Sequence, residues 1–147
     1  MRVHPLWRGL AAASLAATAG LHVALVPEHL REAPYAAALF IALSASCLLL
    51  ALLIVTWGDR RLWGAGTALV GAAMVAYLLS RSVGLPAMQD DIGDWLNPLG
   101  VAALACELVG AVICLRAAML WRKTRTISPP VRKSGDRDGA FYTHPPS

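Results

Sequence analysis

Residues 98–121 read PLGVAALACELVGAVICLRAAMLW, an apolar run that is long enough to cross a lipid bilayer. A helix needs about 20 such residues to span a hydrocarbon core of ~30 Å. The one carboxylate in this run, Glu107, lies near its middle. An ionisable group at that depth is costly and is seldom without a role. We therefore expect Glu107 to belong to the functional part of the protein.

Three further apolar segments of spanning length precede this one. Of the 147 residues, 57% are hydrophobic and only 15% are charged, and the mean hydropathy is +0.56. Ordinary soluble domains are less apolar than this. The sequence predicts an all-α polytopic membrane protein with four transmembrane helices in a compact bundle. That domain covers residues 9–121, with helices at about residues 9–26, 35–57, 62–82 and 98–121.

The basic residues gather at one end of these helices. They lie in the flank formed by residues 1–8, in the short connection at Arg60 and Arg61, and in the tail formed by residues 122–147, whereas the other two connections are acidic. The positive-inside rule places both termini in the cytoplasm, with the protein in the plasma membrane. Solvated anchoring explains the net charge of +4, so we expect no nucleic-acid partner. The tail lacks periodic apolar residues, and we expect it to be disordered.

The first segment leaves one alternative open. Residues 1–8 could be the positive region of a signal peptide, and residues 17–19, Ala-Thr-Ala, resemble a cleavage site. However, the apolar run continues to Val26 and a second spanning segment follows closely. We therefore expect an uncleaved helix.

The sequence carries no familiar catalytic signature. It has no Gly-rich phosphate loop, nucleophile elbow, HExxH or CxxC pattern. The three cysteines, Cys47, Cys106 and Cys114, lie inside predicted helices at spacings that match no zinc or redox site. We interpret them as packing residues, and we expect neither an enzyme nor a cofactor.

Small and weakly polar residues form stripes at helical spacing on each predicted helix. In lipid, such stripes let helices approach closely. We therefore expect them to face one another, with Glu107 on the protein-facing side. The stripes are Ser14, Thr18 and His22; Phe40, Ser44, Cys47 and Ala51; Gly64, Ala68 and Gly71; and Gly100, Ala103, Glu107, Gly110, Ala111 and Cys114.

Most other ionisable groups fall in the outer half of the bundle or in the loops above it. Glu107 lies ~13 Å along its helix from Pro98, and His22 lies ~6 Å from Val26. We expect Pro27 to end the first helix and residues 28–33 to form a separate turn. The predicted polar cluster consists of His22, Glu28, His29, Glu32, Tyr77, Arg81, Asp94 and Glu107.

Three interpretations of this cluster stay open. In the first, Glu107 is structural and is protonated or hydrogen-bonded to Tyr77, His22 or a serine. In the second, Glu107, His22 and the outer carboxylates form a proton or cation path. In the third, His22 and His29 bind a metal or haem together with Glu28 or Glu32. A break at Pro27 speaks against the third, because the two histidines would not share a helix face.

Arg81 and the tryptophans have simpler interpretations. We expect Arg81 to be an interfacial anchor, and alternatively an ion-pair partner of Glu107 or Asp94. The acidic cluster of Asp90, Asp91 and Asp94 is predicted to be a solvated loop, and alternatively a calcium or cation site. Trp57, Trp63, Trp95 and Trp121 fall at predicted helix ends, as an aromatic belt requires.

Two stretches carry a resemblance to known proteins. The first is His22-(x)4-Pro27-Glu28-His29-Leu30-(x)-Glu32-(x)-Pro34-Tyr35, and the second is Ser80-Arg81-Ser82-Val83-Gly84-Leu85-Pro86 followed by Asp94-Trp95. With Glu107, they resemble a group of small four-helix integral membrane proteins of actinobacteria. The resemblance covers most of residues 21–115. It implies the architecture but no mechanism.

The sequence thus predicts a non-enzymatic accessory or subunit protein that has a polar cluster in the outer half of its bundle. Its expected partners are the lipid bilayer and a membrane protein or a second copy of the chain. The alternative function is proton or cation conduction, or metal or haem binding, through the same cluster.

Overall fold

The computed structural model describes residues 4–126, and in this range the chain is helical with no β-strand. Four long helices follow one another: α1 (Pro5–Glu32), α2 (Pro34–Thr56), α3 (Arg60–Ser82) and α4 (Pro98–Thr126). A short 3-10 turn, η1 (Gln89–Asp91), lies between α3 and α4. All four long helices are apolar enough and long enough to cross a membrane. The prediction of an all-α membrane bundle is confirmed.

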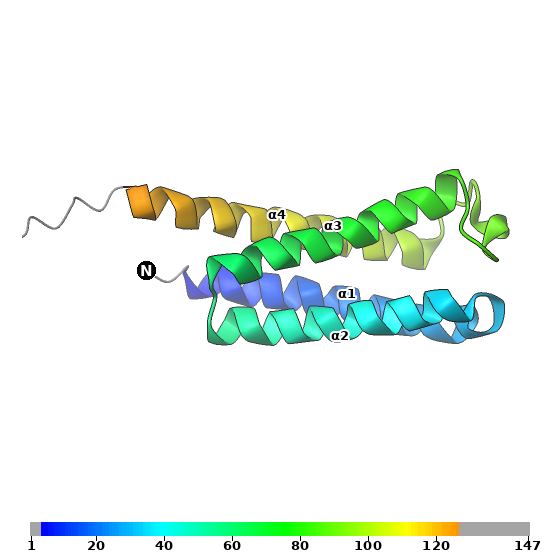
Figure 1. Ribbon diagram of the computed structural model, residues 1–147, viewed down its shortest axis with the longest axis horizontal. Helices are drawn as coiled ribbons and strands as arrows, with labels where there is room; N and C mark the ends of the chain where they lie inside the picture. The colour runs from blue at the N-terminus through cyan, green and yellow to red at the C-terminus, as the bar shows by residue number, and fades with distance from the viewer. Residues whose placement is uncertain (1–3, 127–147) are drawn as a thin grey trace, which may run out of the picture.

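The helices form two antiparallel hairpins that pack side by side (Figure 1). α1 packs against both α2 and α4, and α3 packs mainly against α4. α2 and α3 have the least extensive contact of the four long-helix pairs that touch. The start of α1, the α2–α3 turn and the end of α4 lie together at one end of the bundle, which we call the terminal end. The α1–α2 turn and the loop that contains η1 lie at the other, the η1 end.

Pro27 does not end the first helix, so the predicted break is wrong. α1 continues through Pro27 to Glu32, and Ala33 alone separates it from α2. A proline removes one N–H donor from a helix, but it leaves the following donors free to bond. The Ala33 N–H still bonds to the His29 carbonyl at 2.9 Å. Five of the six residues expected to form a separate turn, residues 28–32, therefore extend α1 at the η1 end.

The last helix is also longer than predicted. α4 continues past Trp121 to Thr126, so the first residues of the expected tail are helical. The rest of the predicted disordered tail, and residues 1–3 of the predicted N-terminal flank, lie outside the described residues. The bounds of the other two helices, α2 (Pro34–Thr56) and α3 (Arg60–Ser82), agree with the predicted segments to within two residues.

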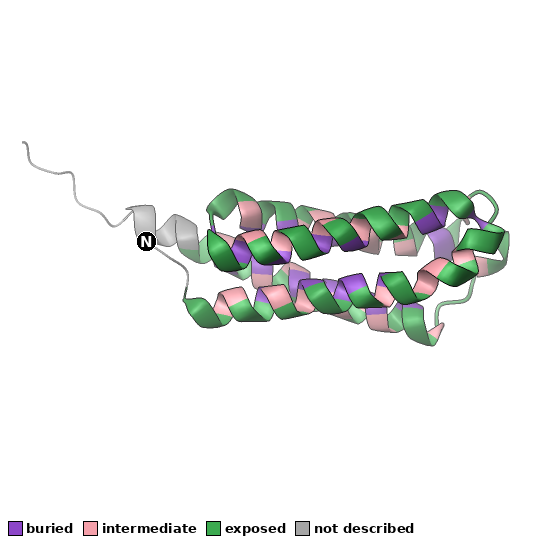
Figure 2. Ribbon diagram, turned by 90° about the horizontal axis from the view of Figure 1, so that it is seen from below, coloured by how far each residue is buried: buried purple, intermediate pink, exposed green. Residues whose placement is uncertain are grey.

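An apolar core fills the terminal half of the bundle. Figure 2 shows the buried positions along the inward faces of the helices. The largest buried side chain is Trp63, which is fully buried and donates its indole N–H to the Gly58 carbonyl at 3.1 Å. Trp63 is therefore a core residue and not part of an aromatic belt. The core consists of Ala11, Leu15, Ala19, Cys47, Ala51, Ile54, Trp63, Val70, Cys114 and Ala117.

The small-residue stripes are confirmed on three helices and wrong on α3. On α4, the stripe that includes Glu107 faces the other helices, as do the predicted stripes of α1 and α2. On α3, however, a Cβ atom added at Gly64 or at Gly71 would have no neighbour within 4 Å. Gly66 makes the close contact instead, since a Cβ there would lie 3.0 Å from the Cys114 sulfur. Trp63 and Val70 are buried on the same side of α3 as Gly66, so this side of the helix faces the bundle interior.

Candidate functional site

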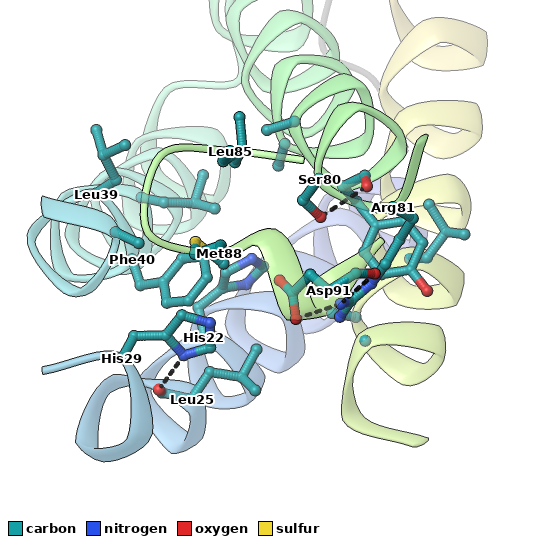
Figure 3. Close-up of a pocket in the computed structure, with 18 of the residues that line it drawn as sticks. His22, Leu25, His29, Leu39, Phe40, Ser80, Arg81, Leu85, Met88 and Asp91 are labelled. Carbon is teal, nitrogen blue, oxygen red and sulfur yellow. Dashed lines mark hydrogen bonds and ion pairs between the residues drawn. The ribbon is translucent and has the colours of Figure 1, made fainter. Parts of the chain in front are cut away.

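A cavity of about 300 Å³ lies between the four helices in the η1 half of the bundle. All four helices and the η1 loop contribute to its lining (Figure 3). Alanine and leucine are the commonest lining residues, and the apolar core lies beyond the cavity towards the terminal end. Its ionisable groups lie in two places, at its inner end around Glu107 and at the η1 end around Arg81.

The exposed lining residues show where the cavity opens. Leu39 on α2 and Ala72 and Ala76 on α3 line the cavity and are exposed, and they belong to membrane-spanning helices. Two further exposed lining residues, Glu28 and Glu32, lie near the end of α1. From these exposed residues we infer that the cavity opens laterally between α2 and α3 and has an acidic mouth at the η1 end.

His22 and Glu107 meet at the inner part of this cavity. The His22 Nε2 atom lies 3.4 Å from Glu107 Oε1, and the side chains are only 7% and 2% exposed. From His22 to the end of α1 the helix rises ~15 Å, and from Pro98 to Glu107 it rises ~13 Å. The two residues lie at the same height because α1 continues past Pro27. A helix ending at Val26 would have placed His22 much nearer the turn.

The backbone fixes the tautomer of His22. Its Nδ1 atom lies 2.9 Å from the Thr18 carbonyl oxygen, and a carbonyl can only accept a hydrogen bond. Nδ1 therefore carries a hydrogen, and Nε2 faces the carboxyl group. If the pair holds one proton at this contact, either Glu107 donates it to a neutral imidazole, or an imidazolium donates it to the carboxylate. The net charge of the pair is zero in both forms.

His29 repeats the arrangement of His22 one heptad later. Its Nδ1 lies 2.9 Å from the Leu25 carbonyl, and both imidazoles meet the Phe40 ring edge-on, with centroid distances of 5.2 Å for His22 and 4.8 Å for His29. The two histidines thus share a helix face, contrary to the prediction. The Phe40 ring packs against both, as Figure 3 shows. Among the described residues, no group of three His, Cys, Asp or Glu side chains could hold a metal ion.

Arg81 forms a buried ion pair at the η1 end. Its Nη1 atom lies 2.6 Å from Asp91 Oδ1 and also donates to the Asp91 carbonyl at 3.3 Å. The guanidinium carbon lies 5.2 Å from the centre of the Tyr77 ring. Asp94, the partner proposed from the sequence, is exposed and does not line the cavity. Arg81 is therefore a structural ion-pair residue, and its partner is Asp91.

Two tyrosines hold the η1 loop over the end of the cavity. Tyr35 donates its hydroxyl to the Pro86 carbonyl at 2.6 Å, and Tyr77 donates to the Trp95 carbonyl at 3.1 Å. Tyr77 also packs so closely on α4 that a Cβ at Gly100 would lie 2.8 Å from its ring. Together with the ion pair of Arg81, these contacts attach the loop to α2 and α3.

The structure brings together most of the predicted cluster. Seven of its eight members line the one cavity: His22, Glu28, His29, Glu32, Tyr77, Arg81 and Glu107, whereas Asp94 does not. The predicted cluster did not include Tyr35, Asp91 or Asn97, which also line the cavity. Tyr35 had a detectable signal, because it directly follows the proline that opens α2. Asp91 had none that distinguished it from the acidic residues beside it.

No family model, no curated protein and no solved structure matches this chain. The fold and the cavity define it as a multi-pass helical membrane protein with a polar site inside the bundle. The resemblance to actinobacterial four-helix proteins stays a prediction.

Proposed function

We propose that this protein is a non-enzymatic membrane protein that binds a small amphiphilic molecule between its two hairpins and acts as an accessory protein through that ligand. The observation that carries this proposal is the cavity itself, with apolar walls, a lateral opening and ionisable groups inside. Its volume of about 300 Å³ lies at the lower end of the range for small-molecule sites. An apolar tail fits the opening between α2 and α3, and a polar head fits the interior.

The apolar core favours binding over conduction. His22 and Glu107 line the inner end of the cavity, and from Glu107 to the core residue Ala117 the helix rises ~15 Å. Across this distance the inward faces carry tightly packed residues such as Leu15 and Trp63. Among the described residues, a conducted ion or proton would meet no carboxylate or imidazole in this region, only hydroxyl groups such as those of Ser14 and Thr18 and the cysteine thiols. The apolar core therefore closes the cavity towards the terminal end. A cavity that is closed at one end favours binding over conduction.

The charge distribution supports an orientation in the membrane. Arg8, Arg60 and Arg61 lie at the terminal end, and the acidic mouth lies at the η1 end. By the positive-inside rule, the terminal end faces the cytoplasm and the cavity faces outward. We propose the plasma membrane as the location and a membrane protein or a second copy of the chain as the partner.

Thermal unfolding in a neutral detergent tests the binding function. A ligand that binds only the folded state stabilises it by about 2.7 kcal/mol at a hundredfold excess over its Kd. The panel contains decyltrimethylammonium, decanesulfonate and decyldimethylphosphine oxide, which share a tail but differ in charge. We expect at least one of them to raise the Tm of the wild type.

Two matched variants locate the effect. Ala72→Trp fills the cavity from α3, whereas Ala65→Trp lies one heptad earlier on the same exposed face and outside the cavity. Stabilisation should be lost in the first variant and kept in the second. If no compound stabilises the wild type, or if Ala72→Trp responds like the wild type, the proposed binding function is wrong.

A further inference from the structure

We propose that the ligand is a monovalent amphiphilic organic cation, and that its binding to Glu107 releases the proton shared by Glu107 and His22. This inference rests on the proposed binding function and names the ligand's charge and its coupling to a proton. It is carried by the charges that line the cavity and by the geometry of the buried pair.

The lining carries more acidic than basic groups. Its carboxylates are Glu28, Glu32, Asp91 and Glu107, and among the described lining residues the one Lys or Arg is Arg81. Arg81 is already paired with Asp91 at 2.6 Å. An anionic head would therefore meet acidic groups at the mouth and no free Arg or Lys inside. A cation meets carboxylates at the mouth, at Glu28 and Glu32, and at the inner end, at Glu107, which favours its entry.

Glu107 is the acidic group that a cation can reach at the inner end. The titratable or charged groups around it are His22 on α1, Cys47 on α2, and Tyr77 and Arg81 on α3. Tyr77 donates to the loop, and Arg81 binds Asp91. His22 is thus the group that shares the proton of Glu107. Phe40 lies against His22 and lines the same cavity, so an aromatic ring stands near the position of a bound cation.

Charge balance couples the cation to this proton. The empty pair has a net charge of zero, so a bound cation would leave one uncompensated positive charge in an apolar site. Such a charge costs several kcal/mol. If the shared proton leaves, the products are a carboxylate, a neutral imidazole and the bound cation, and the net charge returns to zero. The proton passes to water through the mouth lined by Glu28 and Glu32.

Calorimetry of decyltrimethylammonium binding measures this exchange. Titrations of the full chain in neutral detergent, carried out in two buffers of different ionisation enthalpy, give the number of protons released. For the wild type we expect about one proton per bound cation, because one full charge must be compensated. Binding without proton release would overturn the proposal, even if the affinity is high.

Two substitutions identify the group that responds. Glu107→Gln keeps the size of the side chain but removes its charge, so it should abolish proton release and weaken binding by about tenfold or more, as expected for the loss of ~1.4 kcal/mol. Glu32→Gln at the mouth should weaken binding mainly at low salt and leave the proton count unchanged. Unchanged binding and release in Glu107→Gln would refute the role of Glu107.

The compound panel separates this proposal from the binding function. If the phosphine oxide or the sulfonate stabilises the wild type and the cation does not, the cavity binds a ligand but the inferred charge is wrong. If no compound stabilises it, both proposals fail. If Glu107→Gln does not fold, as judged by size-exclusion chromatography, the proton count of the wild type decides alone.

Discussion

The contact between His22 and Glu107 can be measured with a double-mutant cycle. We consider His22→Leu, Glu107→Leu and the double variant. In Glu107→Leu, the His22 Nε2 atom loses its partner while Nδ1 stays bonded to the Thr18 carbonyl. In His22→Leu, the carboxyl group of Glu107 is left without its one ion-pair or hydrogen-bond partner in the described structure.

The expected magnitudes follow from burial and from the shared proton. Because the remaining partner can become neutral, each single change leaves an unpaired polar group and not an unpaired charge. That costs about 1–3 kcal/mol for a group as buried as these. The double variant removes both polar groups together and replaces them with apolar side chains of similar size. Its loss of stability should therefore be well below the sum of the two single losses.

Unfolding in mixed micelles of a neutral detergent and dodecyl sulfate measures these free energies. Glu107→Gln is the matched control, because its amide can still donate to Nε2, and it should lose less stability than Glu107→Leu. A positional control is Leu108→Ala, which changes the exposed neighbour on α4. If the two leucine substitutions add to within about 0.5 kcal/mol, the residues are not coupled, and the geometry of the pair would be refuted.

Three further predictions concern the fold. Trp63→Ala should destabilise the bundle by about 3–5 kcal/mol, because the side chain is fully buried. The control Trp57→Ala, at a position that is 71% exposed, should leave the Tm nearly unchanged. Similar losses of stability in the two variants would contradict a core role for Trp63. Gly100→Ala should cost about 1–3 kcal/mol by overpacking against Tyr77, and Tyr77→Leu should relieve that cost when combined with it. Pro27→Ala should keep or raise the Tm and the helix content by circular dichroism, because α1 is already continuous there; a loss of helix content would show that the proline is needed for this turn.

If the His22–Glu107 pair shares one proton, this has a general consequence for a protein of this kind. A lone carboxylate inside a bundle has a charge that must be compensated or removed, but a pair that shares one proton can stay neutral in the absence of a ligand. It acquires a net charge only when something else binds or leaves. The same contact can therefore stabilise the bundle and respond to a charged ligand, which joins the structural interpretation of Glu107 to a functional one.

The number, class and main faces of the helices follow from the sequence. Hydropathy and length decide which segments span a bilayer, and these depend on local composition alone. The small-residue stripe of α4 also identified the inward face of Glu107, because helical periodicity is a local property. The predicted inward face of α3 was wrong because the face that packs inward there depends on residues far apart in the chain. Trp63 and Val70 compete for the same interface, and their packing depends on which helix lies opposite.

The partners of the polar residues were decided by tertiary structure. Whether α1 ended at Pro27 or continued to Glu32 set the height of His22, and the continuation brought it to Glu107. The choice of Asp91 over Asp94 as partner of Arg81 depended on how the η1 loop folds back. A sequence shows which residues carry charge and which face of a helix they occupy. The registry between helices, which determines which charges meet, is set by the packing of side chains that are far apart in the chain.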